Sequence, residues 1–144
     1  MGCDIHLHTE IKIRGGWQHY SAPDTPRCYP LFTKMAGVRA YGDEEPEDQP
    51  IAKPRGIPED ISTVTRIDYD KWEDDRHSHS WLSADEIFEL GMWLRKQNYK
   101  SDEYFDFLFG NHWESFADPE YRSQRVNMFP AELEDIRFVF WFDN

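Results

Sequence analysis

The closing segment of the chain limits the possible folds more than any other. Residues 136–142 read Ile-Arg-Phe-Val-Phe-Trp-Phe, a run of strong strand formers that is apolar on both faces. Such a strand must be covered on both faces, so we expect it at the centre of a sheet or under good cover. Residues 3–13 alternate instead between apolar and polar side chains, which is typical of a strand with one buried face. We expect these two terminal strands to lie side by side.

Between the terminal strands the sequence predicts one further strand and two to three helices. Gly15 and Gly16 supply the positive φ angles of a tight hairpin turn. Ser83 and Glu86 have the spacing of a capping box, which marks the start of a helix. The expected elements are a strand at 17–20 and helices at 31–37, from 83 to about 98 and at 102–109.

This order of elements predicts an α+β fold. We expect a single domain over residues 1–144, built on a mainly antiparallel sheet with two to three helices packed on it. The aromatic content of 16% is that of a chain that folds around a core and not of a disordered one. The stretch at about 42–60 is acidic and rich in proline, so we expect a surface loop there.

Charge and hydropathy restrict the partners and the compartment. The chain has 28 acidic and 16 basic residues, for a net charge of −12. Nucleic-acid binding that releases counterions requires Lys and Arg, so we expect no unaided binding of nucleic acid. No apolar run is long enough to span a membrane, and the start of the chain lacks the basic and apolar regions of a signal peptide. These features, with only two cysteines, predict a cytoplasmic protein that does not contact membranes.

Histidines form the strongest candidate site. Asp4, His6 and His8 project from one face of the first strand at steps of about 6.6–7 Å, close enough to converge on one cation. His77 and His79 repeat the His-X-His spacing, and a placement opposite the first pair completes a site for zinc, manganese or iron. The same pattern fits a polar strand face whose histidines only pack and form hydrogen bonds, so both interpretations stay open. We take His19 as an ordinary side chain.

A divalent ion at this site would permit metal-assisted hydrolysis, because it lowers the pKa of bound water and neutralises a phosphoryl oxygen. Asp70, Asp74 and Asp75 are the candidate catalytic carboxylates, as a base or as partners of the metal ligands. Two weaker candidates are binding residues: Arg55 for a phosphate or a carboxylate, and Trp81 for stacking on a base or for a protein interface.

Several motifs of the chain resemble those of a known family. The chain opens with Met-Gly-Cys-Asp-Ile-His and ends with Val-Phe-Trp-Phe-Asp-Asn, and between them it has Pro-Arg-Gly at 54–56 and His-Ser-His-Ser-Trp-Leu at 77–82. In these motifs it resembles a family of small proteins encoded by tailed bacteriophages and prophages. The resemblance implies expression in the cytoplasm of a host bacterium, and it implies no activity and no catalytic residue.

Three functions are compatible with these observations. The first is a phage accessory protein, for host takeover or against host defence, with a divalent-metal site and phosphoesterase activity on a nucleotide or nucleic acid. The second is a non-enzymatic inhibitor whose acidic runs at 43–48 and 68–75 imitate nucleic-acid phosphates and bind a basic host protein. The third is a protein that sequesters a small nucleotide signal in an aromatic pocket. The expected partner is therefore a host bacterial protein or a nucleotide.

Overall fold

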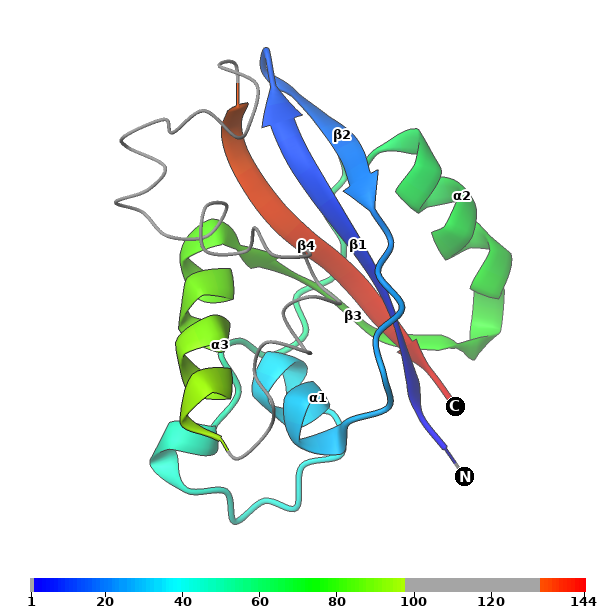
Figure 1. The fold of residues 1–144 in the computed structure, drawn as a ribbon. Coiled ribbons are helices and arrows are strands. Elements are labelled where there is room, and N and C mark those ends of the chain that lie inside the picture. The colour runs from blue at the N-terminus through cyan, green and yellow to red at the C-terminus, as the bar shows by residue number, and fades with distance from the viewer. Residues whose placement is uncertain (1, 98–132) are drawn as a thin grey trace.

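A computed structural model describes residues 2–97 and 133–144 of the chain, and these form an α+β fold around one antiparallel sheet (Figure 1). The four strands stand in the order β2-β1-β4-β3. The N- and C-terminal strands pair along almost their whole length, from Asp4 opposite Asp143 to Ile13 opposite Leu133. The predicted adjacency of the terminal strands is therefore confirmed. The strands are β1 (Asp4–Ile13), β2 (Gly16–Ser21), β3 (Arg76–Ser83) and β4 (Leu133–Asp143).

β4 is the central strand that its composition predicts. It pairs with β1 on one side and with β3 on the other, and residues 136–142 are all buried. Because successive side chains of a strand point to opposite faces, β4 supplies two different surfaces to the core. One carries Phe138, Phe140 and Phe142, and the other carries Arg137, Val139 and Trp141.

Among the described residues, three helices cover the two faces of the sheet: α1 (Tyr29–Ala36), α2 (Thr63–Trp72) and α3 (Ala84–Lys96). Phe32 of α1 packs on Phe142 of β4, whereas Tyr69 of α2 packs on the next residue, Trp141. The two helices therefore lie on opposite faces, and α3 lies on the same side of the sheet as α1 (Figure 1), with which it shares an apolar core. Short 3-10 helices, η1 (Pro46–Asp48) and η2 (Glu73–Asp75), lie in the connections.

Local sequence signals explain the elements that were predicted. The Ser83 hydroxyl accepts a hydrogen bond from the Glu86 amide, and the Glu86 carboxylate accepts one from the Ser83 amide, so the capping box is present at the start of α3. α1 ends at Gly37, whose φ of 73° favours glycine. The acidic stretch at 42–60 is a loop that carries η1. The helix predicted at 102–109 lies outside the described residues.

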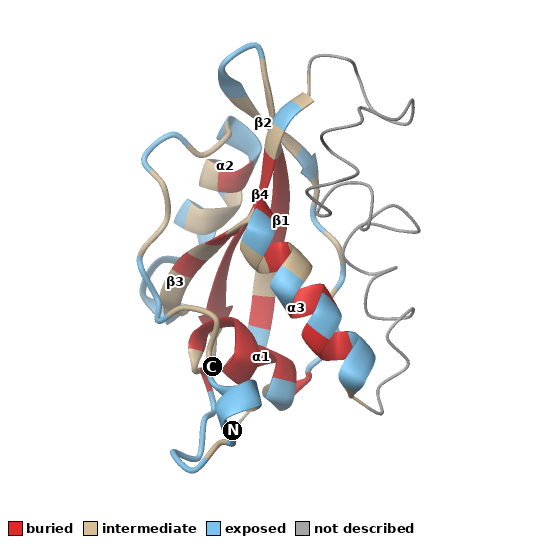
Figure 2. Cartoon of the chain, turned by 90° about the vertical axis from the view of Figure 1, so that its left-hand side faces the viewer, coloured by how far each residue is buried: buried red, intermediate tan, exposed pale blue. Residues whose placement is uncertain are grey.

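Two elements, α2 and β3, have no clear signal in the sequence. α2 is capped by the Ser62 hydroxyl, and Thr65 is its one buried residue. Figure 2 shows this helix mostly in the colours of exposed and intermediate residues, whereas α1 and α3 turn buried residues toward the sheet. β3 has an irregular register between His77 and Ser80, where Ser78 has a φ of 53°. No helix within the described ranges has the length and apolar character needed to cross a membrane.

Candidate functional site

The sheet face beneath α2, which we call the polar face, brings together several of the predicted site residues. His8 of β1 lies at its centre and is only 4% exposed. Its Nε2 lies 2.7 Å from Oδ2 of Asp68 on α2, and its Nδ1 lies 2.9 Å from Nε2 of His19 on β2. Because an ionised carboxylate only accepts hydrogen bonds, His8 donates through Nε2, and its Nδ1 accepts from Nε2–H of His19 when both rings are neutral.

The neighbours of this pair hold it in place. The indole Nε1–H of Trp72 donates to the second oxygen of Asp68 at 3.3 Å, which fixes the carboxylate against His8. Burial, and then the adjacent His8, hold the pKa of His19 below its usual value. The result is a row of three hydrogen-bonded side chains, His19 of β2, His8 of β1 and Asp68 of α2, in which the two imidazoles contact each other directly.

His6 lies two residues earlier on the same face but belongs to a different group of contacts. Its Nε2 lies 2.5 Å from Oδ2 of Asp143, and its ring lies against the rings of Trp72 and Trp141, at centroid distances of 4.0 and 5.9 Å. His6 therefore packs between aromatic rings and pairs with the carboxylate at the end of β4.

Glu10 anchors the start of α2 at the other end of the polar face. One carboxylate oxygen accepts from the guanidinium of Arg137, at 2.8 and 3.0 Å, and the other accepts from the Ser62 amide and the Thr65 hydroxyl. Burial alone would raise the pKa of Glu10, but the hydrogen bonds from Ser62, Thr65 and Arg137 outweigh it, so the pKa is lowered. Glu10 is thus an ionised, fully paired carboxylate in the interior.

The five residues predicted as metal ligands do not form one cluster. Asp4 forms an exposed ion pair with Arg27, and His77 stacks on Phe142 and contacts Asn144. His79 lies against Tyr69, and its buried Nδ1 has no hydrogen-bond partner among the described residues. Within residues 2–97 and 133–144, no group of three or more His, Cys, Asp or Glu side chains is arranged to hold a metal ion.

Two structural features keep the histidines apart. β4 lies between β1 and β3, and the ring of its Trp141 stacks on His8 at a centroid distance of 5.3 Å. The irregularity in β3 then separates His77 from His79, because His77 stays paired with Phe142 of the apolar face while His79 contacts α2. A metal site built from all five residues stays a prediction from sequence.

The predicted catalytic carboxylates lie on the outer side of α2 and in η2. Asp70, Asp74 and Asp75 are exposed. The carboxylate of this region that contacts a histidine is instead Asp68. Hydrolysis through the three exposed carboxylates stays a prediction from sequence, and Asp68 was not among the predicted site residues.

Sequence reasoning also missed the contribution of His19, although a signal for it was present. The hairpin pairs Ile13 with Gly16, and counting outward along both strands places His19 opposite Glu10, on the face that carries His8. The alternation of β1 together with the turn at Gly15 was enough to find this neighbour.

The predicted binding residues Arg55 and Trp81 contact each other. The guanidinium of Arg55 lies 4.0 Å from the centre of the Trp81 ring, donates to the Trp81 carbonyl and pairs with Glu86 of the capping box. In this arrangement Arg55 ties the 42–60 loop to the start of α3.

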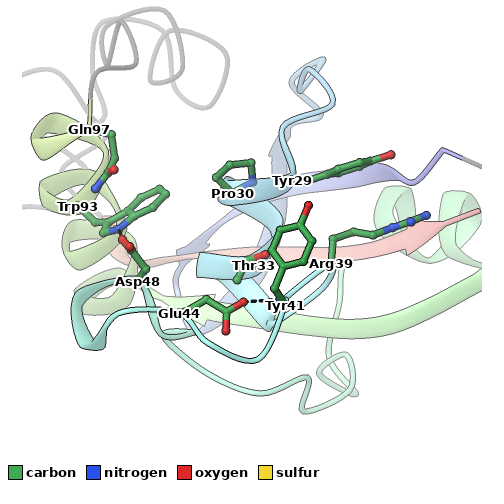
Figure 3. A pocket seen from close by; sticks show the side chains of 9 residues that line it. All are labelled: Tyr29, Pro30, Thr33, Arg39, Tyr41, Glu44, Asp48, Trp93 and Gln97. Atoms are coloured by element: carbon green, nitrogen blue, oxygen red, sulfur yellow. Dashed lines mark hydrogen bonds between the residues drawn. The ribbon is translucent and has the colours of Figure 1, made fainter.

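A separate hollow of about 410 Å³ lies on the other side of the molecule, between α1, the loop at 39–48 and the end of α3. Figure 3 shows Trp93 of α3 and Gln97, which follows α3, on one side of it and Tyr29, Tyr41 and Arg39 on the other. The lining residues are Tyr29, Pro30, Thr33, Arg39, Tyr41, Glu44, Asp48, Trp93 and Gln97.

The carboxylates of the pocket are held by hydrogen bonds to other residues around it. Asp48 accepts from the indole of Trp93 at 2.9 Å, and Glu44 accepts from the amides of Tyr41 and Gly42. The Tyr41 side chain is 92% exposed, so the wall that it forms lies at the protein surface. No sequence pattern identified this pocket, because its three walls come from segments that no local rule places together.

Comparison with protein-family models, with curated proteins and with solved structures gave no match.

Proposed function

We propose that the protein binds a small planar ligand, the base of a nucleoside or nucleotide, in the pocket between α1, the 39–48 loop and α3. The observation that carries the proposal is the set of three aromatic side chains, Tyr29, Tyr41 and Trp93, around one hollow of about 410 Å³. Pockets for small ligands have volumes of about 300–1,000 Å³ and combine apolar walls with a few polar groups. The function is then sequestration of a nucleotide signal.

The walls suit a flat ring. Base stacking on an aromatic side chain is worth about 1–3 kcal/mol per base and tolerates different bases, because every base has a π face. At the rim, the Gln97 side chain offers both a donor and an acceptor, which is the combination that pairs with the polar edge of a base.

The charges of the lining favour a ligand with few phosphates. Arg39 is the cation of the lining, whereas Glu44 and Asp48 are carboxylates. A phosphate near the two carboxylates would be repelled, so we place the base inside the pocket and a phosphate, if present, on the side of Arg39. Nucleosides and monophosphates should therefore bind more tightly than triphosphates.

Isothermal titration of the full chain with the four ribonucleosides and with their mono- and triphosphates tests the proposal. We expect at least one nucleoside or monophosphate to bind, and Tyr41→Ala to weaken it by about 5- to 150-fold, the equivalent of one stacking contact. Tyr20→Ala, at an exposed tyrosine of β2, is the matched control and should bind as the wild type does. No binding by any probe, or equal binding by Tyr41→Ala, would defeat the proposal.

Chromatography of the same mixtures after incubation with Mn²⁺ separates sequestration from hydrolysis. Recovery of the ligand unchanged supports a binding protein. Release of phosphate, lost in an Asp70→Asn, Asp74→Asn, Asp75→Asn triple variant, would instead support the phosphoesterase predicted from the sequence and would overturn sequestration as the function.

A further inference from the structure

We propose that His8 and His19 form a binding site for a divalent transition-metal ion, with Nδ1 of His8 and Nε2 of His19 as its ligands. The inference concerns the polar face and does not depend on the pocket. It differs from the site predicted from sequence, because of the five residues of that site only His8 takes part.

The separation of the two nitrogens matches adjacent positions around an ion. They lie 2.9 Å apart. Two nitrogens at about 2.0–2.1 Å from one ion are about 2.9 Å apart when they subtend a right angle, and about 3.3–3.4 Å apart in a tetrahedron. Right angles between neighbouring ligands occur in square-planar and octahedral sites, so the pair suits Cu²⁺ or Ni²⁺ better than Zn²⁺.

The distal nitrogen of His8 is arranged as in a metal-bound histidine. Its Nε2 lies 2.7 Å from Asp68, whose other oxygen accepts from Trp72. A carboxylate on the far nitrogen fixes the tautomer, orients the ring and raises the basicity of the nitrogen that binds the ion. With the His8 proton on Nε2, its Nδ1 carries a lone pair and is directed toward His19.

In the metal-free pair one proton lies between the two nitrogens, and the metal ion replaces the proton in that position. When both rings are neutral, Nε2–H of His19 donates to Nδ1 of His8, 2.9 Å away. When the ion binds, His19 exposes the Nε2 lone pair and carries its proton on Nδ1, so no net proton is gained or lost. His19 is partly exposed on β2, an edge strand of the sheet, which gives an ion a path to the pair. The described residues supply no third side-chain ligand of the usual kinds, so water fills the remaining positions.

Titration of the full chain, free of any His tag, with Cu²⁺ tests the site. We expect one tight ion per chain, with an electron paramagnetic resonance spectrum split by two imidazole nitrogens. His19→Gln should abolish this signal, and Asp68→Asn should weaken binding by about 10- to 100-fold while both ligands remain. Urea unfolding of each variant checks that it still folds.

His77→Ala is the matched control, because His77 lies against Phe142 and away from the pair. It should bind Cu²⁺ as the wild type does. Absence of binding by the wild type, a signal from one nitrogen only, or equal binding by a folded His19→Gln would overturn the site. Loss of binding in His77→Ala would also overturn it and would favour the five-residue site predicted from sequence.

Discussion

The two faces of the sheet come from the same strands but are covered in opposite ways. The face beneath α1 and α3 is apolar: Phe138, Phe140 and Phe142 of β4 meet a core in which the described side chains are almost all hydrocarbon or aromatic. The polar face beneath α2 holds buried His8 and Glu10 in hydrogen bonds and ion pairs. One face is therefore held by burial and the other by specific polar partners.

This difference determines how each face responds to change. Apolar burial is roughly proportional to area and needs no particular partner, so it stabilises α1 and α3 along their whole inner surface. A buried polar group contributes little net stability when it is paired and costs much when it loses its partner. The polar face thus gives little stability for its size, but it places titratable groups in fixed positions.

Loss of β4, the strand that both faces share, should have the largest effect on folding. A chain that ends before Phe138 loses most of β4, which pairs with β1 and β3. We expect no folded protein, measured as absence of soluble expression and of a cooperative thermal transition. A stable, folded truncated chain would contradict the central position of β4.

Phe140→Ala should be the most damaging single substitution on the apolar face. Phe140 is fully buried, and removal of a buried phenylalanine side chain costs about 3–5 kcal/mol of unfolding free energy. Urea unfolding measures this loss. A loss below about 1 kcal/mol would mean that the apolar face is not what holds the fold.

Glu10→Gln tests the polar face, with an expected loss of about 3 kcal/mol, because it breaks a buried ion pair. The loss should be at the lower end of the range for such pairs, since Asp60 still contacts Arg137. The pKa of Glu10 is lower in the folded protein than in the unfolded chain, so its contribution is present above the unfolded pKa of about 4.3 and is lost as the pH falls below it. Urea unfolding at several pH values should therefore show the gap between wild type and variant narrowing in acid; a constant gap would exclude this ion pair as its cause.

Asp4→Asn should have the smallest effect. Asp4 belongs to β1, as Glu10 does, but its ion pair with Arg27 is exposed, and water screens exposed pairs. We expect an unfolding free energy indistinguishable from that of the wild type. A clear loss of unfolding free energy would mean that exposed and buried ion pairs on this strand contribute alike to stability.

The apolar face is the part that the sequence predicts well. The apolar run at 136–142, the alternation of β1 and the capping box at Ser83 are local patterns, and each leads directly to its element. The predicted fold class and the adjacency of the terminal strands follow from them.

The polar face cannot be predicted in the same way, because its partners are far apart in sequence and meet only in the fold. Glu10 and Arg137 are 127 positions apart, and His8 and Asp68 are 60 apart. The irregular register of β3 at Ser78 separates two histidines that a regular strand would place on one face. His19 is the exception, because the short hairpin fixes its position.

Native-state hydrogen exchange, resolved by residue, tests most directly whether the two faces are held by different forces. We predict that the amides of β4 and α3 exchange only through global unfolding, whereas those of α2, which buries only Thr65, exchange through a local opening of lower free energy. Equal opening free energies for α2 and α3 would contradict the account.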